Sequence, residues 1–84
     1  MTEYRFIIGK QEKHEIFIRY SEWTGKLIVD VDGRRVVETY AIGFKKELEM
    51  DVGDNEKHKI KIVLKGIMFP KIEVYVDGEK IYTA

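Results

Sequence analysis

The chain has 84 residues, with 15 basic and 15 acidic residues and no cysteine. This length predicts one domain, residues 1–84, and the zero net charge argues against a dedicated binder of nucleic acid or anionic membranes. The lack of cysteine excludes a disulfide framework, a thiolate zinc site and thiol catalysis. No apolar run is long enough to span a membrane, and the first residues do not form the apolar core of a signal peptide. We therefore expect a cytoplasmic protein.

Glycines and strand-forming residues divide the chain into short segments. Seven glycines separate eight stretches rich in β-branched and aromatic residues, and none shows a sustained helical period. Lys and Glu are abundant while Gln11 and Asn55 are the only side-chain amides, a composition typical of thermophilic proteins. The predicted strands are residues 3–8, 14–20, 26–31, 34–40, 44–51, 57–65, 71–76 and 79–83.

Two Asp-Gly pairs predict tight hairpins. Asp32-Gly33 and Asp77-Gly78 each lie between apolar runs, and Asp-Gly favours the type I′ turn that matches the twist of the flanking strands. Because the surrounding residues also resemble each other, we interpret them as one hairpin solution used twice. The predicted partners across these turns are Val29 with Val36 and Val74 with Ile81.

A third hairpin is predicted from charge, with its loop at residues 52–56. One face then pairs opposite charges while the other is mostly apolar, and a one-residue slip would exchange the two faces. The predicted charge pairs are Asp51 with Lys57, Glu49 with Lys59 and Glu47 with Lys61. The predicted partners on the other face are Leu48 with Ile60, Met50 with His58 and Phe44 with Leu64.

Eight short antiparallel strands with one apolar face require a closed or double-layered fold. Strands of about six residues leave room for side chains but hardly for a ligand cavity. The sequence therefore predicts an all-β fold, an eight-stranded antiparallel two-sheet β-sandwich. The candidate core residues are Phe6, Ile8, Ile16, Ile18, Leu27, Val29, Val36, Leu48, Met50, Ile60, Ile62, Leu64, Ile72, Val74, Val76 and Ile81.

The two sets of connections differ in polarity. If every strand reverses direction, the first, third, fifth and seventh connections share a polar end, and the others share an end with several apolar residues. Those apolar residues could plug the end of the sandwich, or they could stay exposed as a contact surface. The hypothesis is that a protein-binding surface forms there from Trp23, Ile42, Met68 and Phe69.

No assembled catalytic or metal-binding constellation is visible. His14 lacks the second histidine of a zinc helix and is interpreted as a surface residue, while His58, opposite Met50, is interpreted as structural. Ser21 is the only serine and has no nearby histidine partner. We therefore predict no enzyme activity, no metal and no cofactor.

Nucleic-acid binding is the alternative function. Small β folds bind single strands with basic grooves and aromatic stacking, and one predicted strand carries a row of lysines. In the predicted pairing, acidic residues of the preceding strand neutralise that row, which favours a solvated face instead. The candidate residues are Lys57, Lys59, Lys61 and Lys65.

The order of these signals resembles a known family. The run from Gly25 to Gly33 leads to a Val52-Gly53 turn, a Lys-rich strand, the Gly66–Phe69 loop and the run from Glu73 to Lys80. Over residues 14–82 this is similar to a domain of the Fas apoptotic inhibitory molecule family. The resemblance implies a compact antiparallel β-sandwich without enzyme activity that acts through protein contacts.

The sequence thus favours a protein-interaction or small structural module. Its partner would be another protein or a second copy of the chain. The first and last strands, residues 3–8 and 79–83, are candidate sheet edges, so both a monomer and an edge-strand homodimer fit the sequence.

Overall fold

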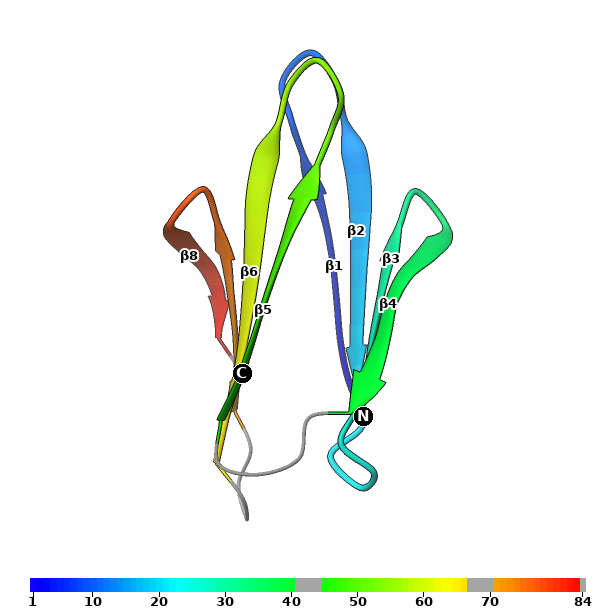
Figure 1. Cartoon of the computed structure of the whole chain (residues 1–84), viewed down its shortest axis with the longest axis vertical. Coiled ribbons are helices and arrows are strands. Elements are labelled where there is room, and N and C mark those ends of the chain that lie inside the picture. The colour runs from blue at the N-terminus through cyan, green and yellow to red at the C-terminus, as the bar shows by residue number, and fades with distance from the viewer. Residues whose placement is uncertain (41–44, 67–70, 84) are drawn as a thin grey trace. The chain divides into compact units, whose positions relative to one another are not determined.

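A computed structural model describes residues 1–40, 45–66 and 71–83. All regular secondary structure within these ranges is β-strand, which confirms the predicted all-β fold (Figure 1). Residues with high strand propensity, separated by glycine turns, account for this. The strands are β1 (Thr2–Ile8), β2 (His14–Tyr20), β3 (Lys26–Val31), β4 (Arg34–Tyr40), β5 (Lys45–Val52), β6 (His58–Lys65), β7 (Lys71–Val76) and β8 (Glu79–Thr83).

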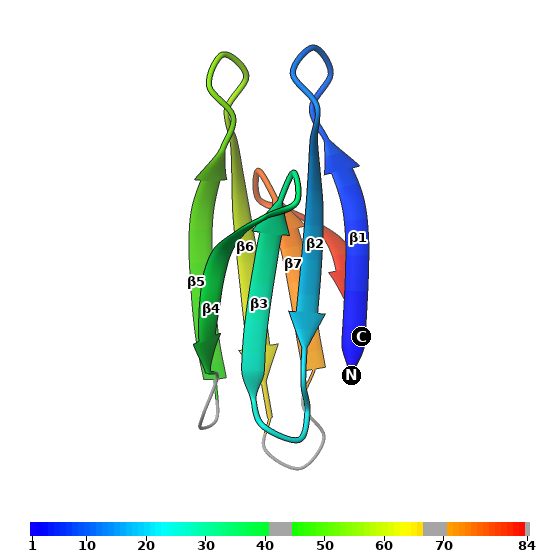
Figure 2. The ribbon, with the colours of Figure 1, turned by 90° about the vertical axis from the view of Figure 1, so that its right-hand side faces the viewer.

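The strands form two four-stranded antiparallel sheets, in the orders β1-β2-β3-β4 and β5-β6-β7-β8. Each sheet is a meander in which every strand pairs with its neighbour in sequence, and Figure 2 shows β1 to β4 in this order. The sheets belong to two compact units, Met1–Ala41 and Ile42–Ala84. In a meander the first and third connections lie at one end of the sheet, and the second connection lies at the other end.

The buried side chains lie mainly on one face of each sheet. Cross-strand pairs such as Ile18 with Val29 and Ile62 with Val74 place β-branched side chains side by side on this face. Most candidate core residues are buried, whereas Phe6, Leu48, Met50 and Val76 are half-buried. The buried residues are Ile8, Ile16, Ile18, Tyr20, Leu27 and Val29 in the first unit and Val52, Ile60, Ile62, Val63, Leu64, Ile72 and Val74 in the second.

Each Asp-Gly hairpin contains a bulge, and because of it Val36 and Ile81 are not core residues as predicted. In the first hairpin Asp30 pairs with Arg35, but Val29 then pairs with Val37, so Val36 is an extra residue and is 52% exposed. A bulge leaves its extra residue outside the ladder, so that residue leaves the apolar face. The second hairpin repeats this: Val74 pairs with Tyr82, and Ile81 is exposed. The predicted pairs Val29 with Val36 and Val74 with Ile81 are therefore wrong.

The third hairpin is shifted by two residues from its predicted register. Val52 pairs with His58 and Met50 with Ile60, so the loop runs over residues 53–57. The predicted pairs Met50 with His58 and Leu48 with Ile60 are wrong, although a shift of two keeps every side chain on its predicted face. Leu64 pairs with Lys46, so the predicted pair of Phe44 with Leu64 is also wrong; Phe44 itself lies outside the described residues.

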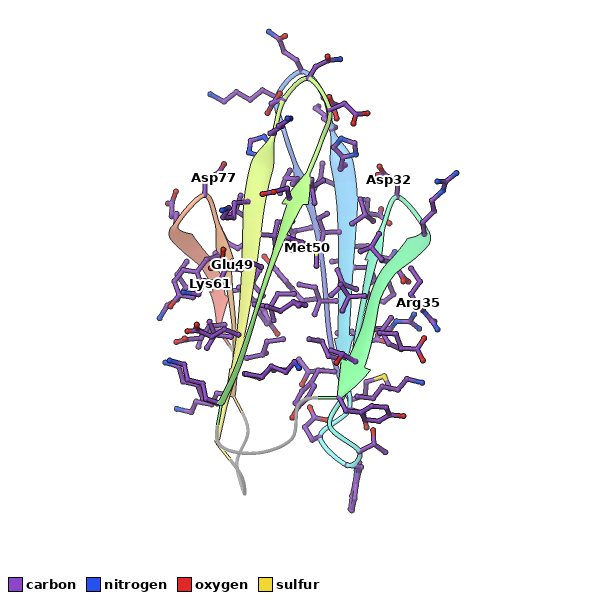
Figure 3. All side chains as sticks on the ribbon, viewed as in Figure 1. Asp32, Arg35, Glu49, Met50, Lys61 and Asp77 are labelled. Atoms are coloured by element: carbon purple, nitrogen blue, oxygen red, sulfur yellow. The ribbon has the colours of Figure 1, made fainter. Side chains whose placement is uncertain are left out.

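The charges of this hairpin still interact, but diagonally. Lys59 Nζ lies 3.8 Å from a Glu49 carboxylate oxygen, and Lys61 Nζ lies 3.8 Å from a Glu47 carboxylate oxygen. In the ladder itself Asp51 is opposite Lys59, and Glu49 is opposite Lys61, the pair labelled in Figure 3. The predicted direct pairs of Asp51 with Lys57, Glu49 with Lys59 and Glu47 with Lys61 are therefore wrong. Solvent screens these exposed contacts, so they contribute little to stability.

The two units repeat one structural plan. The run Gly-x-x-Glu-Lys-His-x-Ile occurs at residues 9–16 and again at 53–60, and each run begins a five-residue loop and continues into the second strand of its sheet. Each unit then closes with a bulged Asp-Gly hairpin. The described ranges hold no helix with the length and apolar composition that crossing a membrane requires.

Candidate functional site

The β2–β3 turn presents the only tryptophan of the chain to solvent. Trp23 is 95% exposed, whereas the backbone on either side of it is held by hydrogen bonds. The Ser21 N–H donates to the Lys26 carbonyl at 2.9 Å, and the Gly25 N–H donates to the Ser21 carbonyl at 2.8 Å. The indole therefore projects from a hydrogen-bonded turn, and Trp23 does not plug the core.

Two further exposed apolar residues lie at the same end of the first unit. Thr2 pairs with Tyr20 and Lys26 pairs with Tyr40, so Met1, the β2–β3 turn and Tyr40 lie at one end of the sheet. Met1 is 75% and Tyr40 is 52% exposed. We call Met1, Trp23 and Tyr40 the Trp23 end.

Ion pairs and a hydrogen bond connect the polar residues around the Trp23 end. The Met1 amino group lies 3.1 Å from a Glu22 carboxylate oxygen, and the Thr2 hydroxyl donates to the same side chain. The Lys26 ammonium lies 3.2 Å from a Glu38 carboxylate oxygen. Of the four residues predicted to form the binding surface, Trp23 is exposed as that hypothesis requires, and Ile42, Met68 and Phe69 lie outside the described residues.

The predicted lysine row is largely engaged with carboxylates. Besides the contacts of Lys59 and Lys61 described above, Lys65 Nζ lies 3.1 Å from Glu73 Oε1. Lys80 binds the other oxygen of Glu73 at 3.2 Å. Lys57 is exposed in the loop that precedes β6. The row is thus part of a charge-balanced face, which disfavours phosphate binding because a nucleic-acid ligand would have to displace these carboxylates.

Arginines on the first sheet are balanced in the same way. The guanidinium carbons of Arg5 and Arg19 lie 4.4 Å and 5.2 Å from the Phe17 ring centroid. Arg19 also donates to Asp30 at 3.2 Å, and Arg35 lies 3.8 Å from the same carboxylate. Cation–π contacts and ion pairs therefore engage Arg5, Arg19 and Arg35.

Each unit contains a histidine held between two carboxylates. In the first unit His14 Nδ1 lies 2.6 Å from Asp32 Oδ2, and His14 Nε2 lies 2.5 Å from Glu12 Oε2. In the second unit His58 Nδ1 lies 2.6 Å from Asp77 Oδ2, and His58 Nε2 lies 2.6 Å from Glu56 Oε2. We call these the His14 cluster and the His58 cluster.

Three segments of each unit meet at its cluster. The histidine begins the second strand, the glutamate comes from the preceding loop, and the aspartate occupies the first position of the Asp-Gly turn, labelled for both units in Figure 3. Asp32 and Asp77 have positive φ values of 53° and 51°, as a type I′ turn requires. The histidine side chains are only 18% exposed.

Backbone hydrogen bonds fix the aspartates. Asp32 Oδ1 accepts from the Glu15 N–H at 2.8 Å, and the Asp32 N–H donates to the Glu15 carbonyl at 2.9 Å. Asp77 makes the same two contacts with Lys59, at 2.9 Å and 2.8 Å. Each Asp-Gly turn is therefore attached to the strand beside it by both its backbone and its side chain.

The carboxylates favour the charged form of each ring. Hydrogen bonds to Asp32, and next to Glu12, raise the pKa of His14 above its usual 6.5. Asp77 and then Glu56 raise the pKa of His58 in the same way. In return, the pKa values of Asp32 and Asp77 are lowered, mainly by the histidine and next by the backbone N–H. Both clusters thus stabilise an imidazolium between carboxylates.

This arrangement does not suit a metal ion. Each carboxylate binds a different ring nitrogen, so the acidic groups lie on opposite sides of the ring and do not converge on one point. In the described ranges no group of three metal-ligating side chains has the geometry to hold an ion. No serine or cysteine adjoins the imidazole in either cluster's contacts, so neither cluster assembles a nucleophile.

Sequence reasoning missed these clusters, since it interpreted both histidines one at a time. A signal was present: the repeated Gly-x-x-Glu-Lys-His at residues 9–14 and 53–58, each followed about 18 residues later by an Asp-Gly turn. Neither the models of known protein families nor the curated proteins that we compared with the chain give a match. The resemblance to the Fas apoptotic inhibitory molecule family stays a prediction.

Proposed function

We propose that this protein is a non-enzymatic binding module that engages a partner protein through the Trp23 end. One observation carries the proposal: an indole that is 95% exposed stands on a turn held by backbone hydrogen bonds. Tryptophan is the side chain most enriched among binding hot spots. Because the turn is ordered before binding, docking loses less conformational entropy than it would from a flexible loop.

The partner that fits this end is a protein with an apolar pocket. Glu22 is engaged with the Met1 amino group and Lys26 with Glu38, so the surroundings of the indole carry paired charges. The two aromatic side chains offer at most about 300–500 Å², at about 150–250 Å² each, and Met1 adds less than a further aromatic residue would. That area is below the roughly 800 Å² per partner of a stable interface, which favours a transient heterologous partner over a permanent homodimer.

Differential capture followed by titration tests the proposal. Trp23→Ala leaves the turn's hydrogen bonds in place, and Val36→Ala, which removes an exposed apolar side chain elsewhere in the same unit, is the matched control. A specific partner is captured from lysate by the wild type and by Val36→Ala but not by Trp23→Ala. With the purified partner, Trp23→Ala weakens binding about 30-fold or more, the effect of losing a hot spot of 2 kcal/mol.

The single tryptophan also supplies a direct readout. Its emission starts at the wavelength of a solvated indole and shifts to the blue when the partner covers it. A partner that binds with unchanged emission, or equally well to Trp23→Ala, contradicts the proposal. A blue shift that depends only on the protein's own concentration instead identifies a second copy as the occupant.

A further inference from the structure

We propose that the His14 and His58 clusters are twin proton-operated latches, which fasten the β1–β2 and β5–β6 loops to their sheets when the imidazole is charged. Each latch lies at the end of its meander that carries the first and third connections. In the first unit, the His14 cluster is therefore at the end opposite Trp23. This inference is independent of the proposed function.

The number of N–H donors on the imidazole makes the latch depend on the protonation of the ring. An imidazolium has two N–H donors, and each cluster gives it two carboxylate acceptors, at Nδ1 and at Nε2. A neutral ring has one N–H, so one of its nitrogens then turns a lone pair toward a carboxylate. The three segments are therefore joined through the ring only in its charged state.

The structure also indicates which contact is lost. Asp32 stays bound to the Glu15 backbone whether or not the ring is charged, because those hydrogen bonds do not involve the imidazole. A neutral His14 therefore keeps its N–H on the fixed Asp32 and gives up its contact with Glu12. Glu12 belongs to the β1–β2 loop, so that loop is the segment that loses its contact with the ring. The same reasoning assigns the loss in the second unit to Glu56.

Each ring is flanked by two carboxylates and by one uncharged residue of the neighbouring strand. His14 faces Asp32 from the β3–β4 turn, Glu12 from the loop and the uncharged Ile8 from β1. His58 faces Asp77, Glu56 and the uncharged Val52 in the same order. Two carboxylates therefore act on each ring, and they shift the pKa of both histidines in the same direction.

The direction of the pH effect follows from these shifts. The histidine pKa values are raised by folding, so the fastening is complete below the ordinary value of 6.5 and is lost as the pH rises through the raised values. The aspartate pKa values are lowered, so the contacts between each histidine and its aspartate are lost in acid only as the pH falls through those lowered values.

Nuclear magnetic resonance of the intact chain tests the latches in one sample. Ring ¹³C and ¹⁵N shifts give both histidine pKa values between about pH 5 and about pH 10, which brackets the usual range of histidine. Relaxation of ¹³C in residues 9–13 and 53–57 measures loop order without relying on exchangeable amide protons. We expect both pKa values above 6.5, with each loop losing order at the midpoint of its own histidine.

Glu12→Gln supplies the matched comparison, because the His58 cluster in the same molecule is unchanged. The substitution replaces a charged acceptor with a neutral one, so the pKa of His14 falls toward 6.5 while that of His58 stays constant. The inference is overturned if either wild-type histidine titrates at or below 6.5, or if loop order does not change through the titration. The wild-type result decides the matter even if the variant folds poorly.

Discussion

Substituting Gly9 with alanine tests how the β1–β2 loop is built. Gly9 has a φ of +102°, and a Cβ added there would lie 1.9 Å from the Glu12 carbonyl oxygen and 2.9 Å from its carbonyl carbon. Both atoms are backbone, so the loop has to move to make room. Gly33 is the matched control, because its φ is +81° but an added Cβ meets nothing within 4 Å.

The expected cost differs between the two sites for this reason. An L-residue at positive φ costs about 1–2 kcal/mol at either position. The clash adds a cost only at Gly9, about 1–3 kcal/mol by comparison with overpacked cores. We therefore expect Gly33→Ala to lower the free energy of unfolding by about 1–2 kcal/mol and Gly9→Ala by about 2–5 kcal/mol. The entropy that alanine removes from the unfolded chain is common to both variants and cancels.

Urea unfolding followed by far-ultraviolet circular dichroism measures this difference, at a pH below 6.5 where both latches are charged. Tryptophan fluorescence is unsuitable because the indole is already exposed. In the same Gly9→Ala sample the pKa of His14 should fall relative to that of His58, because the clash displaces Glu12. Equal destabilisation by the two alanines would refute the reasoning about the loop.

Two other expectations concern the core and the lysine row. Leu27→Ala removes a fully buried side chain and should lower the free energy of unfolding by about 2–5 kcal/mol. Val36→Ala, at the bulge, should change it by at most about 0.5–1 kcal/mol. If urea unfolding showed the larger loss for Val36→Ala, the bulged register would be contradicted. The protein should not retain a labelled single-stranded oligonucleotide at low salt, and the double variant Lys59→Glu with Lys61→Glu should behave in the same way. Salt-sensitive retention by the wild type that is lost in the double variant would instead support nucleic-acid binding.

The sequence by itself determined the strands, their antiparallel order and, away from the two bulges, the face that each side chain occupies. Alternating residues such as Ile16 and Ile18 mark the buried face, and the glycine turns limit the length of each strand. Asp32-Gly33 and Asp77-Gly78 specified their turns because few residue pairs adopt positive φ at both positions. These features depend on residues that are close together in the chain.

Only the tertiary structure decided the register, the bulges and the histidine clusters. The alternation of faces is unchanged by a shift of two residues, so it could not distinguish the pair Met50–Ile60 from the predicted Met50–His58. The extra residue at Val36 depends on how a whole hairpin twists, which no local pattern reports. His14 meets Asp32 because pairing of β2 with β3 brings together groups 18 residues apart, and contacts of that range follow from the folded ladder.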